Sequence, residues 1–444
     1  MAKRLDLFLR ATALATAIAL VPVATAGLAA IDARTGPEFG RLTTVFEKIK
    51  QEYVEPVDDD KLIKGAINGM LTAIDPHSSY LDVRDFTNLR TLTEGSYGGL
   101  GLSVSMEDGA VKVIAPTKGS PADKAGVKAG DFITHINGKL IYGGSFDDAV
   151  DQMRGNPGTT VRLTLYRPGR DDPIDLTITR QIIELRPVDY KVVNGIGVIS
   201  VSSFSANAAS QVNAAWAKVR TETGGHPAGL ILDLRGDPGG LLDEALALSD
   251  LFLEKGVILS QRGRYARDTE TFTATPGDIA RGLPIIVLTD EGSASASEIV
   301  AGALQDQHRA LIMGQRSFGK GSVQTIVPLD KGTALKLTTA LWFTPSGRSI
   351  QEGGITPDIA VPQISDPDLR KRAARAARES DLRGHLANQI KDDKDLEKDS
   401  AADPRFKMTP EDLKAKGIDD FQLWYAEQTI GRTTPAVLAA RRHG

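Results

Sequence analysis

Apolar residues recur at helical spacing near the start of the chain, in two runs on either side of the acidic stretch Asp58–Asp60. The runs are Leu42, Val45, Phe46, Ile49 and Tyr53, and then Ile63, Ile67, Met70, Leu71 and Ile74. Because residues three and four apart share one face of a helix, this spacing predicts two amphipathic helices joined by a short turn over residues 40–75. A helical pair of this size cannot bury its own apolar face, so we expect it to pack on another domain or another subunit.

From Tyr97 onward the apolar period shortens to two, which is typical of strands. The alternating runs are Leu102–Val104, Val111–Ile114, Gly130–Gly138, Val161–Tyr166 and Leu176–Thr179. The run that ends at Asn137-Gly138 enters a tight turn. Helix signals follow Gly119-Ser120-Pro121 and continue in the apolar face of residues 146–153. The pattern predicts a β-rich region with two helices.

A third pattern begins near residue 187, where apolar strands alternate with helices. The strands are Ile196–Val201, Leu230–Leu234 and Ile285–Leu288, and the helices are Ala208–Val219, Leu241–Leu253 and Ser297–Gln307. This alternation predicts an α/β core. After about residue 362 the sequence is dense in charge and prone to helix. It fits a solvated helical face, a linker or an assembly arm equally well.

Composition narrows the class of protein. A chain of 444 residues exceeds what one core usually holds, so we expect two or three domains. The net charge of −4 and the absence of a long basic stripe argue against nucleic acid as a partner. With no cysteine there is no disulfide and no thiol nucleophile. The six histidines are scattered along the chain, and their spacing does not indicate a metal site. We expect no cofactor.

The first 26 residues have the layout of a secretory signal. Lys3, Arg4 and Arg10 precede the apolar run Ala11–Val21, and Ala24-Thr25-Ala26 supplies the small residues of a cleavage site. We expect export, for example to a periplasm, with cleavage near Ala26. An uncleaved membrane anchor is the alternative.

Ser295 is the candidate nucleophile. It follows a buried strand and precedes a helix, so its hydroxyl lies near helix N–H groups at the sheet edge. The alternative is plain helix capping, because Ser295 and Glu298 have the spacing of a capping box. A serine needs a base, and Lys320 offers one if burial lowers its pKa.

Two segments together resemble the carboxy-terminal processing protease family. They are SASASEIVAGALQD at residues 293–306 and GQRSFGKGSVQ at residues 314–324. The resemblance implies a Ser/Lys dyad, with Ser295 as nucleophile, Lys320 as base and Gln324 orienting the lysine. Ser293 and Ser297 are competing assignments for the nucleophile, ranked below Ser295. The family also implies a crotonase-like ββα arrangement in the core.

The same resemblance implies an oxyanion site. It pairs the N–H of Ala296 with a glycine N–H from the loop Asp233–Gly240, where either Gly239 or Gly240 is the donor. Members of the family commonly have Asn where Asp237 stands. A carboxylate pointing inward there would disfavour an oxyanion, so we expect Asp237 to face away.

The β-rich region resembles a PDZ domain, on the words GLGL at residues 99–102 and SPADKAGVKAGDFITHINGK at residues 120–139. In that family the amides of the first word hold the C-terminal carboxylate of a peptide, which implies a peptide site at Gly99, Leu100, Gly101 and Leu102. Proteins recognised through their C-terminal residues are the implied partners. A homo-oligomer and an adaptor or activator protein are further expectations.

These patterns and resemblances predict an α/β multidomain protein. Its parts are a signal peptide (1–26), an N-terminal helical segment (27–94), a PDZ domain (95–183), a Ser/Lys protease core (184–362) and a charged helical C-terminal tail (363–444). The expected function is serine endopeptidase.

The sequence suggests two alternative functions. Residues 314–320 fit most of a P-loop, but Gly321 stands where that motif needs Ser or Thr, and a strand follows where it needs a helix. A PDZ scaffold with an inactive protease-like core is the stronger alternative.

Overall fold

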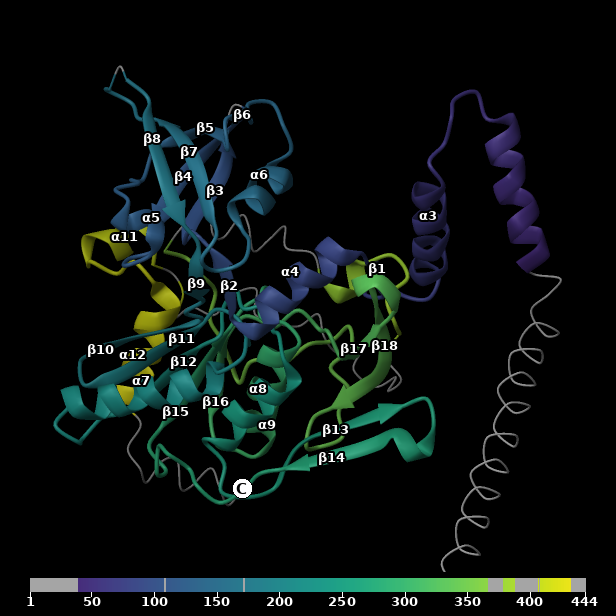
Figure 1. The fold of residues 1–444 in the computed structure, drawn as a ribbon. Coiled ribbons are helices and arrows are strands. Elements are labelled where there is room, and N and C mark those ends of the chain that lie inside the picture. Colours follow the sequence, from purple (N-terminus) through teal and green to yellow (C-terminus); the bar gives the residue numbers. More distant parts are fainter. Residues whose placement is uncertain are drawn as a thin grey trace, which may run out of the picture. The chain divides into compact units, whose positions relative to one another are not determined.

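The computed structural model describes residues 39–107, 109–170, 172–365, 378–387, 406 and 408–432 of the 444-residue chain. The chain divides into two compact units, Met1–Ala73 and Ile74–Gly444. Helices and sheets alternate through the second unit, which confirms the α/β multidomain class (Figure 1). The expected signal peptide lies outside the described residues. Within those residues, no helix combines the length and the apolar character needed to cross a membrane.

The first unit contains the two helices that the periodicity predicts. Residues 39–52 are helical, and α3 spans Asp59–Thr72. Asp58 caps α3 by accepting a hydrogen bond from the Lys61 N–H at 3.1 Å. Apolar side chains of the first helix remain exposed, among them Phe39 at 60% and Val45 at 52%. The surface that covers them stays a prediction.

The β-rich region is a six-stranded sheet in the order β3-β4-β5-β7-β8, with β6 beside β5, and two helices. Its elements are β3 (Leu102–Glu107), β4 (Ala110–Pro116), α5 (Pro121–Lys124), β5 (Phe132–Ile136), β6 (Lys139–Leu140), α6 (Phe146–Met153), β7 (Thr160–Tyr166) and β8 (Ile174–Thr179). Every second residue of the strands enters one core, as Val111 and Val113 do on β4. Among the described strands β3 pairs only with β4, so it is an edge strand. The strands β2 (Ser96–Gly99) and β9 (Gln181–Glu184), which lie before and after this region in the sequence, pair with each other as an antiparallel ribbon.

The main sheet of the core has the order β10-β11-β12-β15-β16-β19. The strands are β10 (Val188–Val193), β11 (Ile196–Val201), β12 (Gly229–Asp233), β15 (Ile285–Thr289), β16 (Leu311–Gly314) and β19 (Ile359–Ala360). The β10–β11 pair is antiparallel, and the remaining pairs are parallel. Parallel strands covered on both faces are apolar at every position, which is why β12 and β15 read as continuous apolar runs.

Helices cover both faces of this sheet (Figure 1). On one face, α7 (Ala208–Glu222), α8 (Leu242–Asp250) and α9 (Ala296–Asp306) pack with Leu230 and Leu232 of β12. The other face presents Ile231 to a cluster that contains Phe421 and Ile430 of α12 (Phe421–Arg432). Successive residues of one strand therefore belong to different cores.

A second sheet contains β1 (Ser79–Leu81), β18 (Ala334–Phe343), β13 (Val257–Gly263) and β14 (Thr269–Thr273), with β17 (Ser322–Pro328) paired to β18. The helix α4 (Val83–Glu94) follows β1. β17 begins two residues after Lys320, whereas α9 begins directly after Ser295. Ser295 thus lies between β15 and α9, and Lys320 lies between β16 of the main sheet and β17 of the second sheet.

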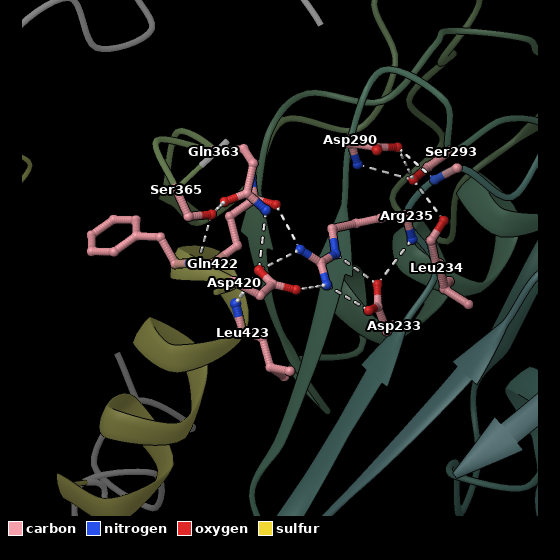
Figure 2. Close-up of polar contacts among 12 residues, drawn as sticks. Asp233, Leu234, Arg235, Asp290, Ser293, Gln363, Ser365, Asp420, Gln422 and Leu423 are labelled. Atoms are coloured by element: carbon pink, nitrogen blue, oxygen red, sulfur yellow. Dashed lines mark hydrogen bonds and ion pairs between the residues drawn. The ribbon is translucent and has the colours of Figure 1, made fainter. Parts of the chain in front are cut away.

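The C-terminal segment is part of the core where the structure describes it. α11 (Pro410–Ala415) and α12 contribute Leu413 and Phe421, each 0% exposed. Figure 2 shows the Arg235 guanidinium between Asp233, at the end of β12, and Asp420, just before α12. For residues 408–432 the alternative of a solvated helical face is therefore wrong.

The guanidinium makes short bonds to both acids. Its Nη2 lies 2.6 Å from Asp233 Oδ2 and 2.7 Å from Asp420 Oδ2. Burial by itself raises the pKa of Asp420, but the hydrogen bonds and charge of Arg235 outweigh it and hold that pKa below its ordinary value. Arg235 thus fastens α12 to the loop that follows β12.

Replacing Arg235 by Met tests this attachment. Arg235→Met leaves two largely buried carboxylates without their cation, so we expect the free energy of unfolding to fall by about 2–4 kcal/mol, less than for a fully buried pair because Asp420 keeps some exposure. The matched control is Arg90→Met, which removes an exposed pair with Glu94 and should cost about 1 kcal/mol or less. Urea unfolding measures both, and equal losses would contradict the role of Arg235.

Candidate active site

Ser295 lies on the turn between β15 and α9, where the sequence predicts it. β15 ends at Thr289, and Ser295 is the residue before the first helical position, Ala296. Its φ is 53° and its ψ is −110°. A non-glycine residue in such a conformation costs about 1–3 kcal/mol, and this kind of strain clusters at functional sites. A residue that only capped a helix would have extended backbone angles.

The helix begins with capping-box geometry at Ser295 and Glu298, of which one half is a clear hydrogen bond. Glu298 Oε2 accepts from the Ser295 N–H at 2.7 Å, whereas the reverse contact from the Glu298 N–H to the serine oxygen falls short of a hydrogen bond. The serine hydroxyl is therefore not committed to the cap. Glu298 thus caps the start of α9 through the Ser295 N–H, whereas the Ser295 hydroxyl does not cap the helix.

The Glu298 carboxylate also binds the loop that carries Lys320. Its Oε1 accepts from Ser317 Oγ at 2.5 Å and from the Gly319 N–H at 2.7 Å, and its Oε2 accepts from the Lys320 N–H at 2.9 Å. The side chain is 0% exposed, and burial raises its pKa to about 7 even though these donors act in the opposite direction. One buried carboxylate therefore joins the Ser295 turn to the Lys320 loop.

A second set of contacts anchors the same loop from its other side. The Gly321 N–H donates to Gln351 Oε1 at 2.9 Å, and Gln351 Nε2 donates to Glu379 Oε1 at 2.8 Å. Glu379 also lies 2.8 Å from His77 Nε2. At Gly319 a Cβ would lie only 2.8 Å from the backbone of Glu352, so the glycine is required there.

Lys320 has the lowered pKa that a general base needs. Burial lowers the pKa most and nearby Lys336 lowers it further, while Glu379, Glu298 and Asp75 act in the opposite direction. Among the described residues, no hydrogen bond joins Lys320 Nζ to Ser295 Oγ. Catalytic hydrogen bonds are often long before substrate binds.

Gln324 lies on β17, four residues after Lys320. Its Nε2 donates to Ser322 Oγ at 2.9 Å and to Thr338 Oγ1 at 3.2 Å. Its role in orienting the lysine stays a prediction.

The two competing serines are buried and occupied. Ser293 Oγ donates to the Leu234 carbonyl at 2.8 Å, and Ser297 Oγ donates to the Asp237 carbonyl at 3.0 Å. Both residues are 0% exposed, whereas Ser295 is partly exposed. Of the three, Ser295 is best placed to meet a substrate.

The glycine loop reaches the Ser295 turn. A Cβ on Gly239 would lie 2.9 Å from the Ala296 nitrogen and 3.0 Å from Ser295 Cβ, so only glycine permits this approach. The Gly239 N–H is bonded to Asp237 Oδ1 at 2.8 Å. Within the described residues, the N–H groups of Gly240 and Ala296 have no hydrogen-bond partner. This favours Gly240 as the loop donor.

The expectation that Asp237 faces away is corrected. Its side chain is 0% exposed and turns into the glycine loop, where it accepts the Gly239 N–H. The reason is local, because an aspartate oxygen readily accepts from the N–H two residues later. Its other oxygen, Oδ2, is buried without a hydrogen-bond partner among the described residues.

The predicted peptide-binding residues follow β2. Gly99 ends β2, Leu100 is 2% exposed, Gly101 has a φ of 73° and Leu102 begins β3. The N–H groups of Leu100 and Gly101 have no hydrogen-bond partner in the described part of the chain. Two free amides beside an edge strand suit a carboxylate.

Sequence reasoning missed the structural roles of Glu298, Arg235 and Glu379. The spacing of Ser295 and Glu298 predicts only a capping role for Glu298, and the local pattern carries no signal for its bonds to the Lys320 loop. Arg235 and Glu379 have partners far away in sequence, so no local signal marks them. For metals, the described residues contain no cluster of three or more histidine or acidic side chains that could bind an ion.

Comparison with known proteins adds family information. Three family models match: Peptidase family S41 over residues 195–361, PDZ domain over residues 112–167, and the activating protease CtpB N-terminal domain over residues 24–85. A carboxy-terminal-processing protease from Bartonella bacilliformis is 49% identical over 361 residues, which cover 81% of this chain and 83% of the relative.

Carboxy-terminal processing protease CtpA from Bacillus subtilis is 38% identical over 324 residues, with 72% of this chain and 68% of the relative covered. Among solved structures, the photosystem II D1 C-terminal processing protease is 28% identical, with a TM-score of 0.45, and the match covers 78% of this chain and 93% of that one.

Replacing Glu298 by Gln tests the joint between turn and loop. The amide nitrogen in Glu298→Gln would face N–H donors, and each bond to a charged acceptor is worth about 1.5–3 kcal/mol. We therefore expect hydrogen exchange in a peptide spanning residues 317–321 to be about 10-fold faster or more. Exchange in the PDZ region should not change.

The matched control is Glu94→Gln, at an exposed acid outside the site. Protection of residues 317–321 equal to that of the parent would show that Glu298 does not hold the loop.

Proposed function

The chain belongs to peptidase family S41, as a serine peptidase of the carboxy-terminal processing type with a PDZ domain, and we propose that it is exported and cleaves proteins through a Ser295/Lys320 dyad. The main observation in support of the dyad is that the Glu298 carboxylate accepts hydrogen bonds from the backbone N–H groups of both Ser295 and Lys320. A strained, partly exposed serine and a partly buried lysine of lowered pKa are thereby hydrogen-bonded through their backbones to the same carboxylate.

In the proposed reaction, neutral Lys320 removes the proton from Ser295 Oγ, and that oxygen bonds to the carbonyl carbon of the scissile peptide. The carbonyl oxygen becomes an oxyanion that accepts from the N–H of Ala296 and of a loop glycine, with about 3–4 kcal/mol from each donor. Lys320 then gives its proton to the leaving amine nitrogen as the C–N bond breaks. A water molecule, deprotonated by Lys320, releases the acyl group and restores Ser295.

The uncovered oxyanion donors support this assignment. Gly240 and Ala296 both have N–H groups without a partner in the described residues, and the Gly239 backbone lies against Ala296. In the part of the chain that the structure describes, no hydrogen bond joins Lys320 Nζ to Ser295 Oγ. We infer that substrate binding brings Lys320 Nζ within reach of Ser295 Oγ.

The PDZ domain is the proposed reader of substrate C-termini. The free amides of Leu100 and Gly101 would bind the terminal carboxylate, and the peptide would extend the sheet beside β3. The exposed edge of β3 and the glycine at residue 101 support this mode.

Export and assembly are further parts of the proposal. The layout of residues 1–26 supports a cleaved signal, with Gly27 as the first mature residue. The exposed apolar residues of the first unit support self-association, because apolar side chains at helical spacing gain free energy on burial. An adaptor that presents substrates would act through the same PDZ edge.

Cleavage assays with paired variants test the dyad. The mature chain should degrade an unfolded model protein with an apolar C-terminus, and Ser295→Ala and Lys320→Ala should each lower the rate by about 10³-fold or more. Activity of the parent should rise with pH through the lowered pKa of Lys320, because only the neutral amine accepts a proton.

Ser210→Ala and Lys139→Ala serve as matched controls at exposed positions. Cleavage that survives Ser295→Ala would overturn the nucleophile. A parent without activity would favour the alternative of an inactive scaffold.

A further inference from the structure

Asp237 is a buried carboxylate beside the proposed oxyanion site. It follows β12 in the glycine loop and is 0% exposed. Its Oδ1 accepts from the Gly239 N–H at 2.8 Å, whereas its Oδ2 is buried without a hydrogen-bond partner among the described residues. An unpaired buried carboxylate is costly when ionised, so its presence needs a physical explanation.

The backbone of Asp237 is fixed to the Ser295 turn at two points. Its carbonyl accepts from the Ala294 N–H at 3.0 Å and from Ser297 Oγ at 3.0 Å. These donors lie one residue before and two residues after the nucleophile. The carboxylate in turn binds the N–H of Gly239, the residue whose backbone lies against Ser295 and Ala296, so it belongs to the loop beside the proposed oxyanion site.

Among the residues that the structure describes, no cation pairs with this carboxylate. The titratable and charged groups on the surrounding elements are Asp290 before α9, Glu298 on α9, Lys320 before β17, Asp243 and Glu244 on α8, and Arg235 on the same loop. None of them forms a hydrogen bond or ion pair with Asp237 in the described part of the chain. Arg235 is bound to Asp233 and Asp420, and Glu244 accepts from the N–H groups of Asn207 and Ala209.

We propose that Asp237 is a positioning residue that supports catalysis only as the neutral acid. In that form its Oδ1 holds the Gly239 N–H and so shapes the loop that presents the Gly240 N–H. Ionised, it places a second negative charge beside the oxyanion and opposes its formation. The inference rests on the proposed function, because it assumes that an oxyanion forms at Ser295.

The charge state of Asp237 changes within the ordinary range of pH. Burial raises its pKa to about 7, while the bond from Gly239 and the contact with Ser297 act in the opposite direction. Activity should therefore require that Lys320 has lost its proton and that Asp237 has kept its own, so the ionisation of Asp237 should lower the activity of the parent as pH rises through about 7. The pKa of Glu298 is also raised to about 7, but Glu298 is present in the parent and in Asp237→Asn, so the difference between their two pH profiles reports Asp237.

The test compares the parent with Asp237→Asn, which keeps the oxygen that accepts the Gly239 N–H and removes the charge. We expect equal kcat/KM values, within about 2-fold, near pH 5.5, where Asp237 is neutral. At pH 9 the variant should be about 10- to 100-fold more active than the parent, the size of a like-charge effect at close range. Asp189→Asn, at an exposed position, should match the parent throughout.

Thermal unfolding gives a readout that does not depend on cleavage. The pKa of Asp237 is higher in the folded protein than in the unfolded chain. The folded protein therefore loses stability as the pH rises from the ordinary pKa of an aspartate, about 4, to the raised value of about 7. Asp237→Asn should therefore melt at the parent's temperature near pH 4 and at a higher temperature near pH 8. This comparison also shows whether the variant is folded.

The outcomes separate the two claims. Ser295-dependent cleavage with coincident pH profiles in the parent and Asp237→Asn would overturn the role of Asp237 and leave the proposed function standing. Equal melting temperatures at pH 8 would contradict a buried, unpaired charge. If no Ser295-dependent cleavage occurs in either protein, the proposed function fails, and the role of Asp237 fails with it.

Discussion

The active site depends on one buried carboxylate that serves two segments. Glu298 accepts hydrogen bonds from the backbone of Ser295 on one side and from Ser317, Gly319 and Lys320 on the other. The serine turn follows β15 of the main sheet, and the lysine loop leads from β16 into the second sheet. The carboxylate adds to the backbone bond from the Phe318 N–H to the Ser293 carbonyl, at 3.0 Å, in setting the relative position of the two segments. A hydrogen-bonded carboxylate suits the task because it can accept from several N–H donors at once.

The rest of the fold holds the parts that surround this link. Gly239 brings the loop after β12 against Ala296, and Arg235 ties that same loop to α12 on the opposite face of the sheet. The loop that contains the proposed glycine donor is therefore bonded to Asp420, the residue before α12, which comes 185 residues later in the chain than Arg235. The C-terminal segment is thereby connected to the glycine loop through Arg235.

The sequence predicted elements whose signals are local. The β12 and β15 strands, the turn at Ser295 and the glycines beside Lys320 each follow from a short stretch of residues. What it could not predict were side chains whose partners are distant: the four donors to Glu298, the bond between Arg235 and Asp420, and the inward turn of Asp237. In each case an acidic side chain is buried or partly buried and therefore needs hydrogen-bond or charged partners. Burial depends on how the whole core packs and cannot be predicted from the local pattern.

The central claim is that Ser295 is a nucleophile activated by Lys320, and covalent labelling tests it most directly. A fluorophosphonate probe, followed by digestion and mass spectrometry, should place the adduct on Ser295 in the parent and give little adduct in Lys320→Ala at the same pH. An adduct on Ser293 or Ser297, or equal labelling of Ser295 without Lys320, would contradict the account.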